Sequence, residues 1–308
     1  HYPIGDLKPE RTDSWEVGLD MKLFKDFNLG LSWYLANTFN QTFDPQISVS
    51  SGYTTIYLQT GYVRNTGLEL SLGYGHTWNN NFRWDSNFTL SHNKNKIKEL
   101  VRDYVHPETG ELINKDRLDV GGLGKARFIL KEGGTLGDLY TQSDLKRDDN
   151  GMVDIDPTGI VAIENNLPDI KLGSVFPKAN LAWSNHFSWK GISLSALFTA
   201  RIGGIVYSAT EAAMDQYGVS ERSALARDNG GVLVNNRTLV DAQNYYTTIG
   251  SESGLPQYYT YNATNVRLQE ASIGYLIPRK WLGNVCDIQV SVIGRNLWMI
   301  YNKAPFDP

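Results

Sequence analysis

Strict alternation of apolar and polar residues over long stretches constrains this chain more than any other feature. From Trp15 to Leu23 every second residue is apolar. The residues between them are Glu16, Gly18, Asp20 and Lys22. Successive side chains of a β-strand point to opposite faces, so such a stretch has one apolar and one polar face. The pattern therefore predicts long amphipathic strands.

The strands are predicted to pair as hairpins, because a short turn-forming segment divides each pair of alternating runs. The runs cover 15–35, 68–90, 181–198 and 273–292. The turns lie at 24–27, 79–81, 190–191 and 277–281. Together they predict four hairpins, or eight strands.

Three long connections, 40–60, 97–177 and 207–257, separate the hairpins and are rich in Gly, Asn, Asp and Tyr. Loops beyond about 15 residues are uncommon in compact soluble domains. Short turns at one end of the strands and long loops at the other are typical of an outer-membrane β-barrel. About 11 residues tilted by about 40° span about 28 Å, close to the apolar band of about 25 Å in such barrels. We therefore expect an all-β fold, part of a large antiparallel transmembrane β-barrel with long extracellular loops.

Two aspects of the organisation follow from the direction of the strands. If the short turns are periplasmic, the chain starts and stops on the outer side, whereas single-chain barrels start and stop in the periplasm. We therefore expect residues 1–308 to be a partial barrel domain without the N-terminal plug and the last strand or strands. The connection 97–177 must contain an even number of membrane passes. Residues 128–140 resemble a strand, so either a partner lies near 159–174 or the whole region is a lid.

Composition excludes several classes of protein. The chain has 29 Lys and Arg against 33 Asp and Glu, so it lacks the basic surplus of a nucleic-acid-binding protein. Cys286 is the single cysteine, which excludes an intramolecular disulfide framework. The longest apolar run, 297–301, is far too short for a transmembrane helix.

Motifs for metals, cofactors or catalysis fail on inspection. The five histidines are scattered and none belongs to an H-E-x-x-H motif. In the acidic stretch 148–156, placing Gly151 at the sixth position of a calcium loop puts Lys146 first and Thr158 twelfth, where carboxylates are required. A solvated acidic turn is the preferred interpretation, and an ion site remains the alternative. We expect no metal, no cofactor and no catalytic residues, hence no enzyme.

Several short segments are similar to motifs of TonB-dependent outer-membrane transporters, and in particular of the SusC/RagA-type subgroup. Asn65-Thr66-Gly67-Leu68-Glu69 resembles its "N-x-G-hydrophobic-E" strand start, and Asn93-Lys94-Asn95-Lys96-Ile97 its "N-K-N-K-V" strand end. Further similar segments, in the order of the family, are 7–20, 172–178, 187–195, 266–278, 294–298 and 305–308. The resemblance covers nearly the whole chain.

The resemblance implies the C-terminal portion of a plugged barrel of about 22 strands in the bacterial outer membrane. It also implies TonB-dependent import of an oligosaccharide or peptide nutrient, with a SusD-like surface lipoprotein as partner. TonB would act through the N-terminal region. Two alternatives stay open: a surface barrel that adheres without transport, and a soluble β-rich glycan-binding module or hydrolase.

Candidate ligand-binding residues lie on the polar strand face and in the last long loop. Arg201, Arg267 and Arg295 share the polar face with Glu69, where they either bind substrate or contact the plug and water. Loop tyrosines can stack on sugar rings or pack on peptide side chains, or they can form loop core. These are Tyr245, Tyr246, Tyr258, Tyr259 and Tyr261.

Overall fold

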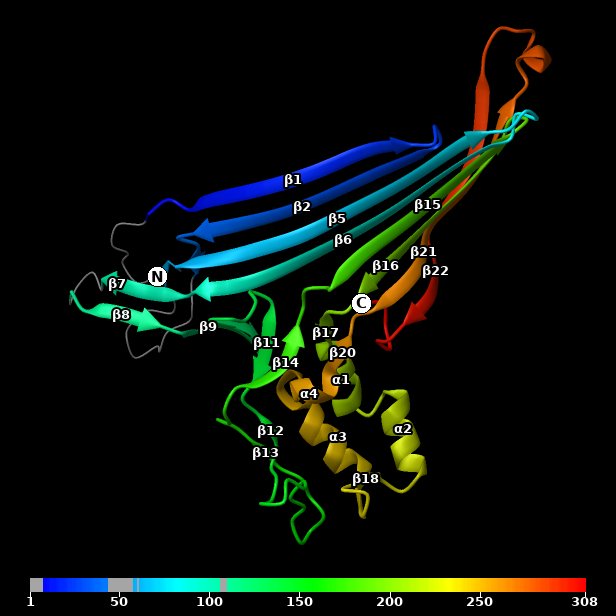
Figure 1. The fold of residues 1–308 in the computed structure, drawn as a ribbon. Coiled ribbons are helices and arrows are strands. Elements are labelled where there is room, and N and C mark those ends of the chain that lie inside the picture. The colour runs from blue at the N-terminus through cyan, green and yellow to red at the C-terminus, as the bar shows by residue number, and fades with distance from the viewer. Residues whose placement is uncertain (1–7, 44–57, 60, 106–109) are drawn as a thin grey trace.

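A computed structural model describes residues 8–43, 58–59, 61–105 and 110–308. Eight long strands form one antiparallel sheet in the order β1-β2-β5-β6-β15-β16-β21-β22 (Figure 1). They are β1 (Arg11–Leu23), β2 (Phe27–Phe39), β5 (Tyr62–Thr77), β6 (Arg83–Glu99), β15 (Ala179–Trp189), β16 (Ile192–Ile202), β21 (Asn265–Ile277) and β22 (Ile288–Asn302). The eight predicted strands and their four hairpin pairings are confirmed.

Cross-strand register turns the alternating sequence into two continuous rows. The apolar row passes through all eight strands as Leu19, Leu31, Leu70, Leu90, Leu181, Ala200, Val266 and Tyr301. The polar row, one residue away, is Gly18, Ser32, Glu69, Ser91, Asn180, Arg201, Asn265 and Asn302. A shift of one residue exchanges the faces of a strand, so this register keeps every apolar face on the same side.

The apolar face of the sheet is not a protein core. Its side chains stay uncovered, with 75% of Trp15, 69% of Val17 and 68% of Val292 exposed. Large apolar surface in contact with water is unfavourable, so a face of this size needs another apolar partner. This exposure agrees with strands that face lipid and argues against the dry centre of a soluble β-sandwich.

The described parts of the long connections gather at one end of the sheet and form structure of their own (Figure 1). In 97–177, β9 (Arg117–Leu123), β10 (Ala126–Lys131), β11 (Asp138–Thr141) and β14 (Ile170–Ser174) form a separate sheet in the order β14-β11-β10-β9. Smaller pairs are β3 (Thr42–Phe43) with β4 (Leu58–Gln59), β7 (Val101–Val105) with β8 (Leu112–Lys115), and β12 (Asp144–Leu145) with β13 (Ile163–Glu164). Since β6 pairs directly with β15, the strands of 97–177 make no membrane pass between them. Of the two alternatives for this region, the structure supports the lid.

The last long loop contains helices, which the sequence analysis did not predict. They are α1 (Ala209–Gln216), α2 (Glu221–Asp228), α3 (Ala242–Gly250), the 3₁₀ turn η2 (Ser251–Ser253) and α4 (Pro256–Tyr259). The strand pair β17 (Ile205–Tyr207) with β20 (Thr260–Asn262) flanks them, and the pair β18 (Val232–Val234) with β19 (Thr238–Val240) lies between α2 and α3. The 3₁₀ turn η3 (Arg279–Leu282) lies in the last short turn. Ser208, Ser220 and Asp241 cap the first turns of α1, α2 and α3. Among the described residues, none of the helices is both long and apolar enough to cross a membrane.

Two buried apolar clusters hold the loops together. One joins the last two long loops through Leu145, Val161, Ala212, Val234, Val240, Ile249, Leu255 and Tyr259. The other joins the first two through Leu58, Val63, Ile97, Leu100, Val101, Leu118 and Leu130. The principal dry cores of the described structure therefore lie in the loops and at the loop ends of β5 and β6, whereas the rest of the eight-stranded sheet is one layer with two open faces.

Candidate functional site

A hollow of about 720 Å³ lies against the polar face of the sheet and includes most of the polar row. Polar groups from seven strands line it, namely Glu16, Asp20, Ser32, Glu69, Ser71, Thr89, Ser91, Asn180, Thr199, Arg201 and Asn265. The carboxylates come from β1 and β5, whereas the Arg201 guanidinium comes from β16. The wall therefore carries negative charge on one side and positive charge on the other.

An amide network connects this wall to the loops. The Asn65 Oδ1 accepts hydrogen bonds from Asn93 Nδ2 at 3.2 Å and Asn95 Nδ2 at 3.0 Å. The Asn95 Oδ1 in turn accepts from the backbone N–H of Leu136 at 2.8 Å. Asn93 also accepts a 3.2 Å hydrogen bond from the Tyr34 hydroxyl. The asparagines of the "N-x-G" and "N-K-N-K" motifs thus lie on the inner face and hold the lid sheet above it.

Arg201 lies where the polar row meets the loops. Its Nη2 donates to the carbonyl of Val175 at 2.6 Å, which ties the chain before β15 to the wall. Its Nε is buried and has no hydrogen-bond partner among the described residues. Buried donors are nearly always paired, so this N–H, on a residue that lines the hollow, is available to water or a ligand oxygen once the side chain moves.

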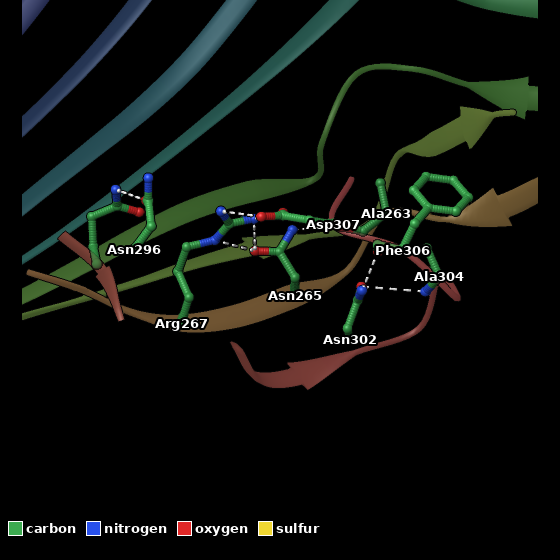
Figure 2. A network of polar contacts seen from close by, with 9 residues as sticks. Ala263, Asn265, Arg267, Asn296, Asn302, Ala304, Phe306 and Asp307 are labelled. Atoms are coloured by element: carbon green, nitrogen blue, oxygen red, sulfur yellow. Dashed lines mark hydrogen bonds and ion pairs between the residues drawn. The ribbon is translucent and has the colours of Figure 1, made fainter. Parts of the chain in front are cut away.

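Arg267 lies on the neighbouring strand and closes a small polar network (Figure 2). Its Nη2 donates to Asp307 Oδ1 at 2.7 Å and to Asn265 Oδ1 at 3.3 Å. Asn302 anchors the same segment through Ala304 and Phe306. The segment after β22 therefore packs back on β21, and the Arg267 guanidinium is already used in holding this segment.

Arg295 is separate from the other two arginines. Its Nε lies 2.9 Å from Glu270 Oε2 across the β21–β22 pair, and 75% of its side chain is exposed. An exposed pair of this kind contributes little to stability. The structure thus brings Arg201 and Arg267 together on adjacent strands and leaves Arg295 apart.

The loop tyrosines pack against the cluster shared by the last two long loops. Tyr245, Tyr246 and Tyr258 are half-buried there, and Tyr245 and Tyr246 meet edge to face at 5.4 Å. Burial raises the pKa of all three phenols, so they remain hydroxyl donors at neutral pH. Their contact with substrate remains a prediction.

A buried ionic centre, which the sequence analysis missed, organises the helices beside these tyrosines. Asp215 on α1 accepts from the hydroxyls of Ser220 at 2.5 Å and Tyr259 at 2.8 Å. Arg222 of α2 pairs with the same carboxylate, and its guanidinium lies 5.0 Å from the Tyr259 ring centroid. The contributing residues are up to 44 positions apart, so no local sequence motif marks them.

Asp169 plays the corresponding role in the lid sheet. Its carboxylate pairs with Arg117 Nε at 2.7 Å and Lys131 Nζ at 2.8 Å, and its side chain is 8% exposed. Hydrogen bonding from Arg117 holds the pKa of Asp169 well below its usual range, with Lys131 lowering it further. The carboxylate therefore fixes β9 and β10 against the end of the lid segment.

The acidic stretch folds as two similar turns. The Asp148 Oδ1 accepts from the N–H groups of Asn150 and Met152, both at 2.9 Å. The Asp156 Oδ1 does the same for Thr158 at 2.8 Å and Ile160 at 2.9 Å. These carboxylates satisfy backbone donors. Within the described ranges, three or more His, Cys, Asp or Glu side chains nowhere come together as a possible metal site.

A sheet with a lipid-facing side, a wet inner side and structured loops at one end defines the wall of an outer-membrane barrel. A family model described as "TonB dependent receptor-like, beta-barrel" matches residues 1–155. The chain belongs to this TonB-dependent receptor family, and its sheet lies in the bacterial outer membrane.

Sequence relatives agree with the family. TonB-dependent receptor P3 of Formosa agariphila is 24% identical over 330 residues, which cover 98% of this chain and 31% of the relative. TonB-dependent receptor P39 of the same organism is 28% identical over 142 residues, covering 46% of this chain and 12% of the relative. The chain thus spans about a third, or less, of the curated relatives it matches.

The fold is similar to solved structures of the RagAB peptide transporter. One of them has a TM-score of 0.67 at 18% identity, covering 97% of this chain and 32% of that chain. Another, the RagAB peptide importer in its "open-open" state, has a TM-score of 0.66 at 18% identity, covering 98% of this chain and 32% of that chain. The SusC/RagA-type resemblance of the sequence is confirmed in the fold.

Proposed function

We propose that this chain forms one side of the substrate path, and part of the extracellular lid, of a TonB-dependent importer of oligosaccharide or peptide nutrients. The polar row carries the proposal: eight strands that expose apolar side chains outward present a continuous polar surface one residue away. A purely structural or adhesive barrel has no need of a charged hollow that opens beneath its own loops.

The chemistry of the hollow suits a polar solute that carries several donors and acceptors. Glu16 and Glu69 accept hydrogen bonds or attract ammonium groups, and Arg201 offers a buried N–H. A peptide matches this separation of charge with its two ends, and an oligosaccharide matches the hydroxyl and amide groups with its own hydroxyls. The two substrate classes therefore differ in their dependence on the charged residues.

The helical loop is the part of the chain proposed to contact a SusD-like lipoprotein. Tyr217, Val219, Leu233 and Leu239 are exposed on it, although they lie near a well-packed core. Apolar side chains that stay exposed beside a folded core are typical of interaction surfaces. In this proposal the lipoprotein covers these four exposed side chains when it closes over the barrel. TonB then drives release of substrate through the remainder of the full-length protein.

Uptake by cells that carry the full-length protein tests the function. We expect Arg201→Gln and Glu69→Gln each to reduce uptake of a labelled substrate about tenfold, equivalent to about 1.4 kcal/mol of binding. The control is Arg279→Gln, which changes an exposed cation in a short turn at the other end of the sheet. The proposal is contradicted if uptake persists without TonB, or if neither Arg201→Gln nor Glu69→Gln changes it.

Comparing two substrate pools distinguishes the classes. Cells receive either a mixture of labelled peptides or a mixture of labelled neutral oligosaccharides. For a peptide importer, the charge-neutralising variants reduce uptake most strongly, because they remove partners of charged ends. For an oligosaccharide importer, Asn180→Ala has the larger effect, because this amide lies in the polar row between Ser91 and Arg201.

A further inference from the structure

On the outer face of β6, the apolar side chains, here called the apolar belt, are followed by cations at the end of the strand nearest the long loops. In the segment 93–97, Asn93 and Asn95 point to the inner network described above. Alternation therefore places Lys94 and Lys96 on the opposite, outer face. On β5, Arg64 lies directly across from Lys96, and Thr66 lies across from Lys94.

This arrangement opposes two like charges in a cross-strand pair. Like charges directly opposite each other destabilise a sheet, and Lys94 adds a third cation one pleat away. Arg64 donates to the neutral Asn37 Oδ1 at 2.8 Å. Within the described part of the chain, no carboxylate forms an ion pair with Arg64, Lys94 or Lys96.

Two nearby acids of the described chain form no ion pair with these cations. Asp13, two strands from Arg64 in the same outer register, pairs with Arg11 at 2.7 Å. The Glu99 side chain lies over Gly61, as shown by the overlap that an added Cβ at Gly61 would meet. The three cations are therefore available to an anion from outside the described chain.

The position of the cluster in the membrane indicates what this anion is. On the outer face, the side chains that precede it toward the short turns on β5 are Leu68, Leu70 and Leu72. On β6 they are His92, which pairs with the Lys178 carbonyl, and then Leu90, Phe88, Ser86 and Trp84. The cations lie at the long-loop end of both strands, which is the extracellular end (Figure 1). An amphiphile with acyl chains against the leucines and phosphate groups at the cations satisfies both surfaces at once.

We propose that Arg64, Lys94 and Lys96 bind the phosphate groups of an anionic glycolipid in the outer leaflet of the outer membrane. The guanidinium donates to a phosphate in bidentate fashion, and the two ammonium groups add positive charge. The lysines of the "N-K-N-K" motif thereby recognise lipid while its asparagines hold the lid. This role is independent of the transported substrate.

Lipid retention by the full-length protein tests the proposal. The protein is purified in detergent, incubated with diphosphorylated lipid A, and analysed by native mass spectrometry for bound lipid. We expect Lys94→Gln/Lys96→Gln to lower retention at least about tenfold, since each basic residue near an anionic membrane surface contributes measurably to attraction. The matched control, Lys25→Gln/Lys280→Gln, removes the same charge at the short-turn end and should retain lipid A fully.

Thermal stability gives a second readout that a merely structural role does not produce. Without lipid A, the Lys94→Gln/Lys96→Gln variant should unfold at the same temperature as the parent or higher, because repulsion with Arg64 is relieved. Added lipid A should stabilise the parent but not the variant. If the double variant does not fold, Arg64→Gln alone is used for both measurements.

Three results overturn the proposal. One is equal retention of lipid A by the parent and the cluster variants. Another is equal retention of dephosphorylated lipid A, which would assign binding to the apolar belt alone. The third is displacement of lipid A by millimolar inorganic phosphate, which would make the cluster a site for free phosphate instead of lipid.

Discussion

The ring of Tyr34 on β2 lies across Gly67 on β5, and a Cβ added at Gly67 would overlap that ring. The contact lets the Tyr34 hydroxyl pass over β5 to reach Asn93 on β6. One glycine therefore allows a hydrogen bond between strands that are not adjacent in the sheet. It gives a physical reason for the glycine of the "N-x-G" motif.

Replacing this glycine should weaken the wall. We expect Gly67→Ala to cost about 1–2 kcal/mol, because the ring must move and lose its hydrogen bond. The measurement is the urea midpoint of the folded, heat-modifiable protein. Gly18→Ala is the control, since its Cβ would meet its nearest neighbour, the Leu31 carbonyl oxygen, at 3.8 Å. If Gly67→Ala costs as much in a Tyr34→Ala background, the ring contact is not the cause.

Adjacent residues on one strand should respond to the same added charge with costs of different size. Leu70→Lys places a cation on the lipid face and should cost about 2–4 kcal/mol near the membrane midplane. Ser71→Lys places it beside the hollow and should cost less than about 1 kcal/mol. Folding into lipid bilayers across a urea series measures both. Equal costs would contradict the assignment of the two faces.

The Asp215 centre should control the order of the helical loop. Asp215→Asn leaves Arg222 without its countercharge, and the Arg222 side chain as a whole is 38% exposed. We therefore expect a loss of about 2–3 kcal/mol, less than for a fully buried pair. Faster hydrogen exchange across α1 to α3, with unchanged exchange in β5 and β6, is the expected signature. The control is Glu221→Gln, which alters an exposed carboxylate in the first turn of α2.

Acid should loosen the lid sheet through Asp169. Its pKa is lowered in the folded state, so its contribution is complete above the unfolded pKa of about 3.9 and is lost as pH falls through the lower folded pKa. Hydrogen exchange of β9 to β11, corrected for intrinsic rates, should therefore accelerate below about pH 4. Asp169→Asn should show the faster exchange already at neutral pH, with a flatter dependence on pH. If Asp169→Asn and the parent show the same hydrogen exchange at every pH, Asp169 is not the cause of the acid loosening.

Much of the candidate site was predictable, because it depends on the alternation within single strands. Glu69 and Arg201 lie in the polar row, as their positions between apolar neighbours indicated. Their partners were not predictable. Whether Arg201 reaches Val175, or Arg267 reaches Asp307, depends on how loops return to the sheet. The sequence indicated the asparagines of the network only as two separate motifs. The register of β5 with β6 brings these two motifs together.

By itself, the sequence determined which side of each strand meets lipid, because successive side chains alternate wherever the backbone is extended. It also determined the hairpins, whose partners are a few residues apart. Only the tertiary structure decided that β6 adjoins β15 across the whole lid, and that four short helices fill the last loop. Those outcomes depend on contacts between distant residues, such as Asp215 with Tyr259 and Arg117 with Asp169, whose energies exist only once the chain has folded.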